Sequence, residues 1–400
     1  MRDPRYLISY AILLSLPPIF EILGIARLTS ILAYSYIMSI YALSFALLLG
    51  YLGLLNFGHA LFFGIGAYVT TYQILWAGVP YPLAMLASML IGGLAGAGAA
   101  FISRKAFRGI PFAFITLTLL LIVYFLYKRR ELRAISGSEQ GLLVPTPQMF
   151  VSPLIPIMAS LIIIAYMVVI LIESRHRGVV ASGTSRVSGT YLSRNNVTWL
   201  SAAALILSVS TYILTIGQMS KPEPYRVSAN LYIVALITLY LVHMAIKMIT
   251  ETPVALIWIA IRDSEARAET MGYSSFSYKT LGLVIAGCFA SLSGSLYISY
   301  SSNINPERAF NPILSIYGLI YSIIGGLYPI EGPILGAILV SIIENFLADY
   351  MGGWSLVIIG VAFIVIIWLL PNGLAFYLWR ARVGVIKGIT RRIARIKSRE

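Results

Sequence analysis

Residues 82–102 read PLAMLASMLIGGLAGAGAAFI, 21 residues in which no side chain is charged. An α-helix rises about 1.5 Å per residue, so about 20 such residues are enough to cross the roughly 30 Å hydrocarbon core of a bilayer. The stretch therefore predicts a transmembrane helix. Its glycines Gly92, Gly93, Gly96 and Gly98 are expected to let a neighbouring helix approach closely.

The same kind of stretch recurs along the whole chain. Hydropathy in a window of about 19 residues predicts about twelve spans, at 7–23, 30–49, 58–77, 82–102, 110–127, 153–172, 198–217, 230–249, 280–300, 313–327, 333–350 and 355–370. None shows the alternating polar and apolar pattern of an outer-membrane barrel strand. We therefore expect an all-α, polytopic integral membrane protein with about twelve transmembrane helices, in which residues 1–377 form the membrane domain.

Composition supports the same class and indicates an orientation. Of the 400 residues, 59% are hydrophobic and 11% are charged, whereas soluble domains carry about 25% charged residues. Lys and Arg outnumber Asp and Glu by 29 to 15, and such an excess concentrates in cytoplasmic loops. Both termini and three basic loops are therefore expected on the cytoplasmic side of the membrane. The loops are 103–109, 173–197 and 250–279. The basic loop 128–152 then falls outside, against the charge rule.

The two ends of the chain have their own patterns. Residues 378–400 hold eight of the 29 basic side chains, separated by apolar residues. This spacing predicts a basic amphipathic helix that lies on anionic lipid headgroups, and nucleic-acid binding is not expected because no recognition fold accompanies the charge. Near the start, Pro17, Pro18 and Glu21 lie in the first apolar segment and favour a retained helix over a cleaved signal peptide.

No catalytic or metal-binding motif is present in the sequence. Its three histidines, His59, His176 and His243, have no carboxylates at metal-ligand spacing, and Cys288 is the single cysteine. The glycine-rich loop that binds nucleotide phosphates is also missing. We therefore expect a protein that is not an enzyme and that binds no metal or cofactor itself. ATP and Mg²⁺, if they drive it, would be bound by another chain.

Two glycine clusters interrupt apolar stretches, GYLGLLNFGHA at 50–60 and GGLYPIEGP at 325–333. Both predict broken helices. Non-helical backbone within a membrane is tolerated where protein buries it or where it lines a wet cavity, and free helix ends there can hold a polar solute. The alternative is that the glycines only allow close packing. For His59, a helix-start residue bonded to nearby backbone is the alternative to a solute contact.

Few ionisable side chains fall within the predicted spans. Glu344 lies in the eleventh span, whereas Glu21, His243 and Asp349 lie near helix ends. Such groups cost about 2.5–3.5 kcal/mol each at the centre of a bilayer, so they usually mark function. A carrier driven by protons or sodium needs a more central set of carboxylates than this.

The loop 250–279 differs from the other loops in its helix signals. Pro253 separates it from the preceding span, good helix formers run from Ala260 to Met271, and Gly272 is placed as a stop. This pattern predicts one short helix on the cytoplasmic side. Its charged residues form either a solvated face or a surface that docks in a groove of a soluble partner.

At this loop the chain resembles the LivM-type permease subunits of branched-chain amino-acid ABC importers. Their characteristic stretch is matched in register by Pro253, Ala260, Ile261, Arg262, Asp263, Glu265, Ala268, Glu269, Gly272 and Lys279. Further matches cover about three quarters of the chain, in order. They are Gly50-Tyr51, Gly53, Gly58-His59-Ala60, Phe63-Gly64, Gly66-Ala67-Tyr68, Thr116-Leu117, Gly137, Gly141-Leu142, Pro306-Glu307, Phe310, Ser315-Ile316, Gly325-Gly326, Gly332-Pro333 and Gly336-Ala337.

The resemblance implies a permease subunit that translocates branched-chain or related hydrophobic amino acids by alternating access. It implies three kinds of partner: cytoplasmic nucleotide-binding subunits, a sister permease subunit in a homo- or heterodimer, and an extracytoplasmic solute-binding protein. The helix that couples to the ATPase would consist of Ala260, Ile261, Arg262, Asp263, Glu265, Ala268, Glu269 and Gly272. The translocation path would include Asn56, Gly58, His59, Thr116, Ser315, Gly325, Gly326 and Gly332.

The chain also departs from the family pattern. Ala46 and Leu54 stand where a polar residue is expected near the path, and Leu256 and Ile259 replace arginines at the start of the coupling stretch. Residues 153–217 predict an inserted pair of spans beyond a family core of about ten. Urea, short amides or another small polar solute therefore remain alternative substrates. A twelve-helix secondary transporter and an inert scaffold are the alternative classes of function.

Overall fold

The computed structural model describes residues 27–138, 140–145, 223–351, 355–369 and 373–377, with the isolated positions 13, 147, 150 and 380. Apart from positions 13 and 380, three predicted features lie outside the described residues. They are the first span at 7–23, the inserted pair at 153–217 and the basic tail at 378–400. These three features stay predictions.

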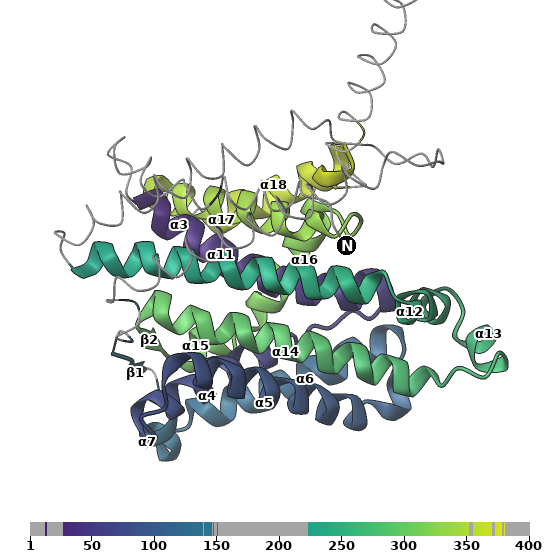
Figure 1. The fold of residues 1–400 in the computed structure, drawn as a ribbon, viewed down its shortest axis with the longest axis horizontal. Helices are drawn as coiled ribbons and strands as arrows, with labels where there is room; N and C mark the ends of the chain where they lie inside the picture. The colour runs from purple at the N-terminus through teal and green to yellow at the C-terminus, as the bar shows by residue number, and fades with distance from the viewer. Residues whose placement is uncertain are drawn as a thin grey trace, which may run out of the picture. The chain divides into compact units, whose positions relative to one another are not determined.

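Helices account for most of the described chain (Figure 1). The α-helices are α3 (Arg27–Ala46), α4 (Ala60–Leu75), α5 (Tyr81–Ile102), α6 (Gly109–Lys128), α7 (Arg133–Ser136), α11 (Glu223–Thr250), α12 (Pro253–Asp263), α13 (Glu265–Thr270), α14 (Ser275–Ser301), α15 (Pro306–Ala309), α16 (Pro312–Gly325), α17 (Glu331–Met351) and α18 (Ser355–Leu369). The smaller elements are the π-helical turn η1 (Leu47–Tyr51), the 3-10 turns η2 (Arg104–Ala106) and η3 (Arg130–Leu132), and the antiparallel strands β1 (Leu142–Leu143) and β2 (Asn303–Ile304).

Within the described residues, five helical segments are long and apolar enough to cross a membrane. They are Arg27–Tyr51, Tyr81–Ile102, Gly109–Lys128, Ser228–Thr250 and Ser275–Ser301. Each overlaps a predicted span, and the all-α membrane architecture is confirmed. The helix α4 has 16 residues because the glycine-rich residues before Ala60 leave the helical conformation. The predicted breaks after the second span and between the tenth and eleventh spans both occur.

The chain divides into two compact units, one of residues 1–33 and 146–240 and the other of residues 34–145 and 241–400. The second, here called the core unit, contains most of the described residues. In it the turns and loops gather at two opposite ends (Figure 1). One end carries α12 and α13, and the other carries β1 and β2.

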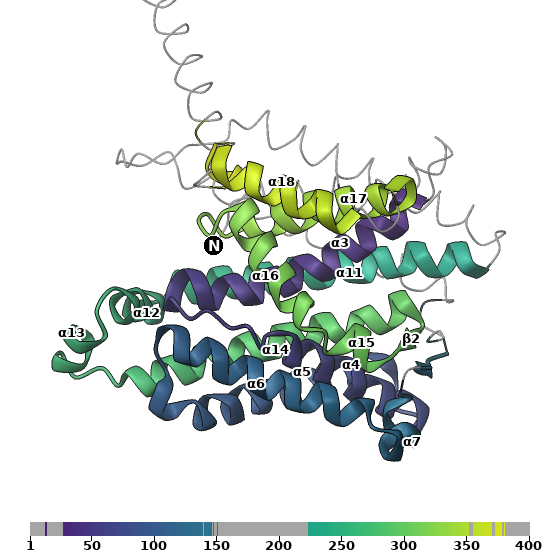
Figure 2. The same ribbon diagram turned by 180° about the vertical axis from the view of Figure 1, so that it is seen from behind.

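The helix α14 packs against both α5 and α4, as the two opposite views show (Figures 1 and 2). Backbone-to-backbone approach is possible because glycines lie at the contacts. A Cβ atom at Gly92 of α5 would lie 1.8 Å from Ser291 Oγ of α14, and one at Gly294 of α14 would lie 1.9 Å from the carbonyl oxygen of Phe63 of α4. Apolar side chains drive little association inside lipid, so such small-residue contacts carry the packing.

Three of the four glycines in α5 have the predicted packing role. Besides Gly92, a Cβ atom at Gly93 would lie 2.5 Å from Cys288 Sγ, and one at Gly96 would lie 2.5 Å from a carbonyl oxygen of α14. The prediction is wrong for Gly98, because a Cβ atom there has no atom within 4 Å. Gly98 lies on a different face of the helix from the three glycines that meet α14, and residue type alone did not separate them.

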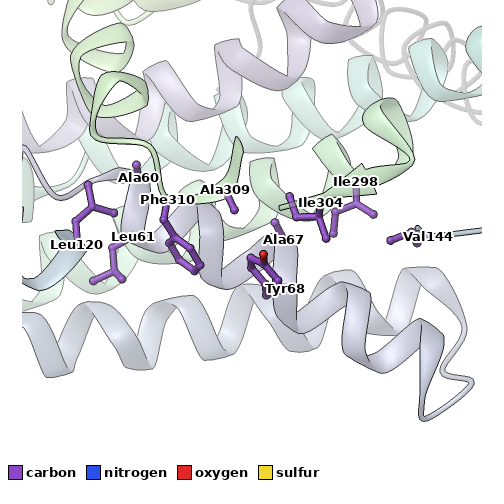
Figure 3. Packing of buried hydrophobic residues seen from close by; sticks show 10 residues of the cluster. All are labelled: Ala60, Leu61, Ala67, Tyr68, Leu120, Val144, Ile298, Ile304, Ala309 and Phe310. Carbon is purple, nitrogen blue, oxygen red and sulfur yellow. The ribbon is translucent and has the colours of Figure 1, made fainter. Parts of the chain in front are cut away.

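A hydrophobic cluster packs several helices of the core unit together and includes Ile304 of β2 and Val144 after β1 (Figure 3). The rings of Tyr68 and Phe310 are stacked with centroids 5.5 Å apart, and Tyr68 donates a hydrogen bond to the carbonyl oxygen of Ser136 at 2.9 Å. The cluster consists of Ala60, Leu61, Ala67, Tyr68, Leu120, Val144, Ile298, Ile304, Ala309 and Phe310. It joins α4, α6, α14 and α15 across large distances in sequence.

One cation of the basic loop 128–152 forms an ion pair. Lys128 Nζ lies 2.8 Å from Glu307 Oε2, and the Tyr124 hydroxyl donates to the same oxygen at 2.5 Å. These hydrogen bonds, from Lys128 first and Tyr124 second, hold the pKa of Glu307 below its usual value. A carboxylate from α15 therefore offsets part of the positive charge that departs from the charge rule in this loop.

The glycine contacts of α5 give a direct test of this packing. Gly92→Leu should lower the free energy of unfolding by about 1–3 kcal/mol or more, because the new side chain has to enter space filled by Ser291. Gly98→Leu is the matched control, since the same change there meets open space. Thermal unfolding of the two purified variants should separate them, and equal melting temperatures would contradict the packing described here.

Candidate functional site

The helix α12 is built into the core unit along one face. Thr252 begins it in an extended conformation and Pro253 occupies the first turn, where its missing N–H is not needed. Ala255, Trp258 and Ile261 are buried at a spacing of three, and Trp258 Nε1 donates to the carbonyl oxygen of Tyr278 at 2.9 Å. The opposite face, which includes Leu256, is exposed.

The structure corrects the expected single helix at 260–272. Ser264 is extended and divides the segment into α12 and the six-residue α13. After α13 the predicted stop is present, because Gly272 has a φ of 89°. The amides of Gly272 and Tyr273 donate to the carbonyl oxygens of Glu269 and Ala268 at 3.0 and 3.1 Å, which closes the helix with a Schellman motif. Together, α12 and α13 are called the coupling element below, after the coupling stretch that the resemblance implies.

Glu265 anchors α13 to the core unit. Its side chain is 17% exposed, and its carboxylate lies 2.8 Å from Lys279 Nζ at the start of α14 and 2.6 Å from Arg108 Nε after η2. Lys279 is 4% exposed and also donates to the carbonyl oxygen of Phe107 at 2.6 Å. Glu265 therefore faces its own chain, whereas Glu269 is exposed on α13. Of the two carboxylates on this short helix, Glu269 is the one available to a partner.

Arg262 ties the end of α12 to two other segments. Its Nη1 donates to the carbonyl oxygen of Gly50 at 2.6 Å and lies 2.8 Å from the hydroxyl of Tyr328. The Tyr328 hydroxyl in turn donates to the same Gly50 carbonyl at 2.5 Å. Gly53 allows this approach, because a Cβ atom there would lie 2.7 Å from Arg262 Cγ. The three groups, here called the Arg262 clamp, join η1, α12 and the turn between α16 and α17.

The sequence did not predict the partners in this clamp. Arg262 belongs to the predicted coupling stretch, but the Gly50 carbonyl belongs to the backbone and leaves no mark in side-chain patterns. Tyr328 was part of the second glycine cluster, and an aromatic residue before a proline does not indicate contact with an arginine 66 positions away. The Gly50 carbonyl and Tyr328 share one feature, because both lie at helix breaks, where unpaired carbonyls and exposed side chains are available.

Five of the predicted path residues come together around His59. His59 and Asn56 are fully buried, and the imidazole Nε2 lies 2.8 Å from the Ser44 hydroxyl of α3. Asn56 Oδ1 accepts from the amide of Gly58 at 3.0 Å, and its Nδ2 lies 3.4 Å from His59 Nδ1. Phe45 meets the imidazole edge-on, with centroids 5.3 Å apart. The imidazole is thus held by side chains.

Thr116 and Ser315 complete this buried site from two other helices. Thr116 Oγ1 of α6 accepts from the amide of Gly58 at 3.3 Å, and Ser315 Oγ of α16 accepts from the amide of Ala60 at 3.0 Å. Both hydroxyls meet amides at the start of α4 that have no partner within that helix. The buried site is defined as Ser44, Asn56, Gly58, His59, Thr116 and Ser315, and it joins α3, α4, α6 and α16.

The other three predicted path residues lie elsewhere, at the turn between α16 and α17. A Cβ atom at Gly325 would lie 1.9 Å from the carbonyl oxygen of Gly332, and one at Gly332 would lie 2.0 Å from that of Gly326. Gly326 itself has a φ of 99°. The geometry matches the close-packing alternative for this cluster, and the turn is also where Tyr328 reaches the Arg262 clamp.

Comparison with known proteins identifies the family. Residues 27–367 match the family model described as the permease component of branched-chain amino acid transport systems. The chain belongs to this family. It is accordingly a multi-pass protein of the plasma membrane, and the matched residues include the whole coupling element and the buried site.

Two members of the permease family are similar to a part of the chain. The high-affinity branched-chain amino acid transport system permease protein LivM of Escherichia coli is 28% identical over 144 residues, and the protein of the same name from Salmonella typhimurium is 27% identical over 144 residues. The match covers 36% of this chain and 33% of each relative, so it spans about a third of these proteins. No solved structure matches the chain.

Within the described part of this permease, no three His, Cys, Asp or Glu side chains are grouped so that they could hold a metal ion. The charged side chains of the coupling element are paired with other charges or exposed. What the arrangement can do is mechanical, because it connects a short surface helix to the ends of several long helices through charge-assisted hydrogen bonds.

The anchor of α13 predicts a difference between its two carboxylates. Glu265→Gln should lower the free energy of unfolding by about 1–3 kcal/mol, because the buried ammonium of Lys279 then keeps its charge without a carboxylate. Glu269→Gln removes the same charge from an exposed position and should leave stability nearly unchanged. Thermal unfolding in detergent measures both, and an equal loss in the two variants would argue against the anchor.

Proposed function

We propose that this permease is the membrane-spanning subunit of an ATP-binding-cassette importer for branched-chain or related hydrophobic amino acids. Family membership supports a permease for this class of solute, and the names of the two relatives state the same substrate class for those proteins. One observation supports an ATPase-driven mechanism. The coupling element lies at the surface with one face bound to the core unit and the other face exposed.

In this proposal a cytoplasmic ATPase subunit docks on the exposed face of the coupling element. Leu256 and Met271 are 70% and 77% exposed, and Glu269 is also exposed. A few apolar side chains next to charged ones are what a groove on a soluble partner recognises. The end of the core unit with α12 and α13 is then cytoplasmic, as the distribution of Lys and Arg in the loops predicts.

The contacts of the coupling element define how a movement would spread. A shift of α13 acts through Glu265 on the start of α14 and on the loop after η2. A shift of α12 acts through the Arg262 clamp on the end of α3 and on the turn between α16 and α17. Helices that are packed tightly move as bodies, so closure of the ATPases would convert the permease between outward- and inward-facing states.

The solute in this proposal passes between two permease subunits and is delivered by an extracytoplasmic binding protein. ATP and Mg²⁺ are bound by the ATPase subunits, and the permease has no catalytic role. The buried site around His59 is the proposed position where the path meets the helix break before α4. In the described structure its polar atoms are engaged with one another, so a solute would have to exchange hydrogen bonds with them.

Transport in a reconstituted system tests the proposal. Proteoliposomes with the permease, its ATPase and its binding protein should accumulate radiolabelled leucine when ATP is supplied and should not do so without ATP. Competition with urea and acetamide tests the alternative solutes. Uptake by this chain alone, driven by a proton or sodium gradient, would instead establish the secondary-transporter alternative.

The Arg262 clamp predicts a variant that separates hydrolysis from transport. Arg262→Gln should lower leucine uptake per ATP hydrolysed by about fivefold or more, since coupling free energies of 1–3 kcal/mol correspond to factors of about 5–150. Tyr328→Phe should act in the same direction because it removes the second donor to the Gly50 carbonyl. Arg130→Gln, at an exposed position in η3, is the control. Unchanged coupling in both clamp variants would refute the mechanical role.

A further inference from the structure

One carboxylate in the core unit lies in a helix that overlaps the predicted span 333–350, away from the coupling element. Glu344 lies in α17, 13 residues after its first residue. Its Oε2 is buried and makes no hydrogen bond in the described structure, and no ion pair joins Glu344 to a described basic side chain. In contrast, Glu265 and Glu307 both pair with cations.

Tyrosines from three helices surround this carboxylate. The Tyr317 hydroxyl of α16 lies within hydrogen-bonding reach of Glu344, and Tyr321 lies one turn further along the same helix. Tyr34 of α3 and Tyr297 of α14 also lie within electrostatic range of the carboxylate. The rings of Tyr34 and Tyr297 have centroids 6.4 Å apart.

Other polar atoms at the same place also lack partners. The hydroxyls of Tyr321 and Ser341 are fully buried, and neither makes a hydrogen bond of standard geometry within the described residues. Ser341 and Glu344 are three positions apart on α17, so they share a face, and α17 packs against α16. The Glu344 carboxylate and the hydroxyls of Tyr321 and Ser341 therefore lie close together on two adjacent helices, with Tyr321 within reach of Ser341 and Tyr34.

A buried carboxylate such as that of Glu344 needs a charged or hydrogen-bonding partner. An unpaired carboxylate in a low-dielectric interior costs several kcal/mol, and ionisable side chains in membrane spans face protein interiors or water-filled paths. Tyrosine rings present negatively charged faces that attract cations, and Tyr and Ser hydroxyls can accept hydrogen bonds from an ammonium group. A cation with N–H donors complements all of these groups.

We propose that Glu344, Tyr34, Tyr317, Tyr321 and Ser341 form a binding site for the primary ammonium group of the transported amino acid. The inference rests on the proposed function for the identity of the ligand, but the site is defined by its own residues. Tyr297 lies four residues before the end of α14, which leads into β2, whereas Tyr34 lies in the first half of α3 and Tyr317 and Tyr321 lie within α16.

Direct binding tests the site without requiring transport. Radiolabelled leucine is bound to the permease–ATPase complex in nanodiscs, without the binding protein, and displaced by isopentylamine, which has the ammonium group only, or by 4-methylpentanoate, which has the carboxylate only. Isopentylamine should displace leucine and 4-methylpentanoate should not. Glu344→Gln should weaken leucine binding by about tenfold or more, equivalent to about 1.4 kcal/mol. Glu344→Asp should bind more tightly than Glu344→Gln.

Controls keep the result specific to the ammonium site. Glu131→Gln neutralises an exposed carboxylate in η3 and should bind leucine as the wild type does. Each variant must match the melting temperature and size-exclusion profile of the wild type. If Glu344→Gln is destabilised, Tyr317→Phe is tested in its place. This variant should lose less affinity for leucine and should keep the same selectivity for the amine.

Three outcomes would overturn the site. They are wild-type affinity in Glu344→Gln, equal displacement by the carboxylate-only compound, and leucine uptake by the full importer without any binding of leucine to the complex in nanodiscs. A full importer that takes up no amino acid at all would count against the proposed function instead. Leucine binding in nanodiscs that is displaced by the amine would still support the ammonium site, even if the full importer transports no amino acid.

Discussion

Backbone amides that leave a helix inside a membrane protein have to find acceptors within the protein, because lipid offers none. In this permease the constraint applies at the break between η1 and α4. The amides of Gly58 and Ala60 are satisfied by Asn56, Thr116 and Ser315, and His59 fixes the same segment to Ser44. Satisfying one short stretch of backbone therefore determines how α3, α4, α6 and α16 are joined.

The same constraint produces the Arg262 clamp. The carbonyl of Gly50 lies where η1 ends and regular helix bonding stops, and it accepts from both Arg262 and Tyr328. An arginine on α12 and a tyrosine after α16 thereby become fixed to a third segment. The coupling element is attached to the core unit at a point where the core helix is already broken, which is a place where a small movement can change helix direction.

Several charges in the core unit are paired across the chain, since Glu265 pairs with the buried Lys279 and Glu307 pairs with Lys128. Glu344 has no such ion-pair partner among the described residues and lies near tyrosines instead. The paired charges hold helices and loops together. A carboxylate that lies among aromatic rings without an ion pair is instead typical of a site for a ligand from outside the chain.

Much of the fold was predictable from sequence because it depends on local chemistry. Runs of about 20 apolar residues had to become helices in a bilayer. Glycine and proline at 50–60, 253, 272 and 325–333 marked the interruptions, because their backbone preferences act within a few residues. The coupling element was located for the same reason, although its division at Ser264 was missed since serine is only a weak helix breaker.

The remainder was decided by tertiary structure. Residue type could not show that Gly92 meets α14 while Gly98 meets nothing, or that Glu265 points inward and Glu269 outward. Neither could it place Tyr328 beside Arg262 or gather tyrosines of three helices around Glu344. Such contacts depend on which face of each helix is turned to which neighbour, and on atoms separated by tens to hundreds of residues. By itself the sequence determined which segments are helical, where they break and which family they belong to; the packing of those helices decided which side chains meet.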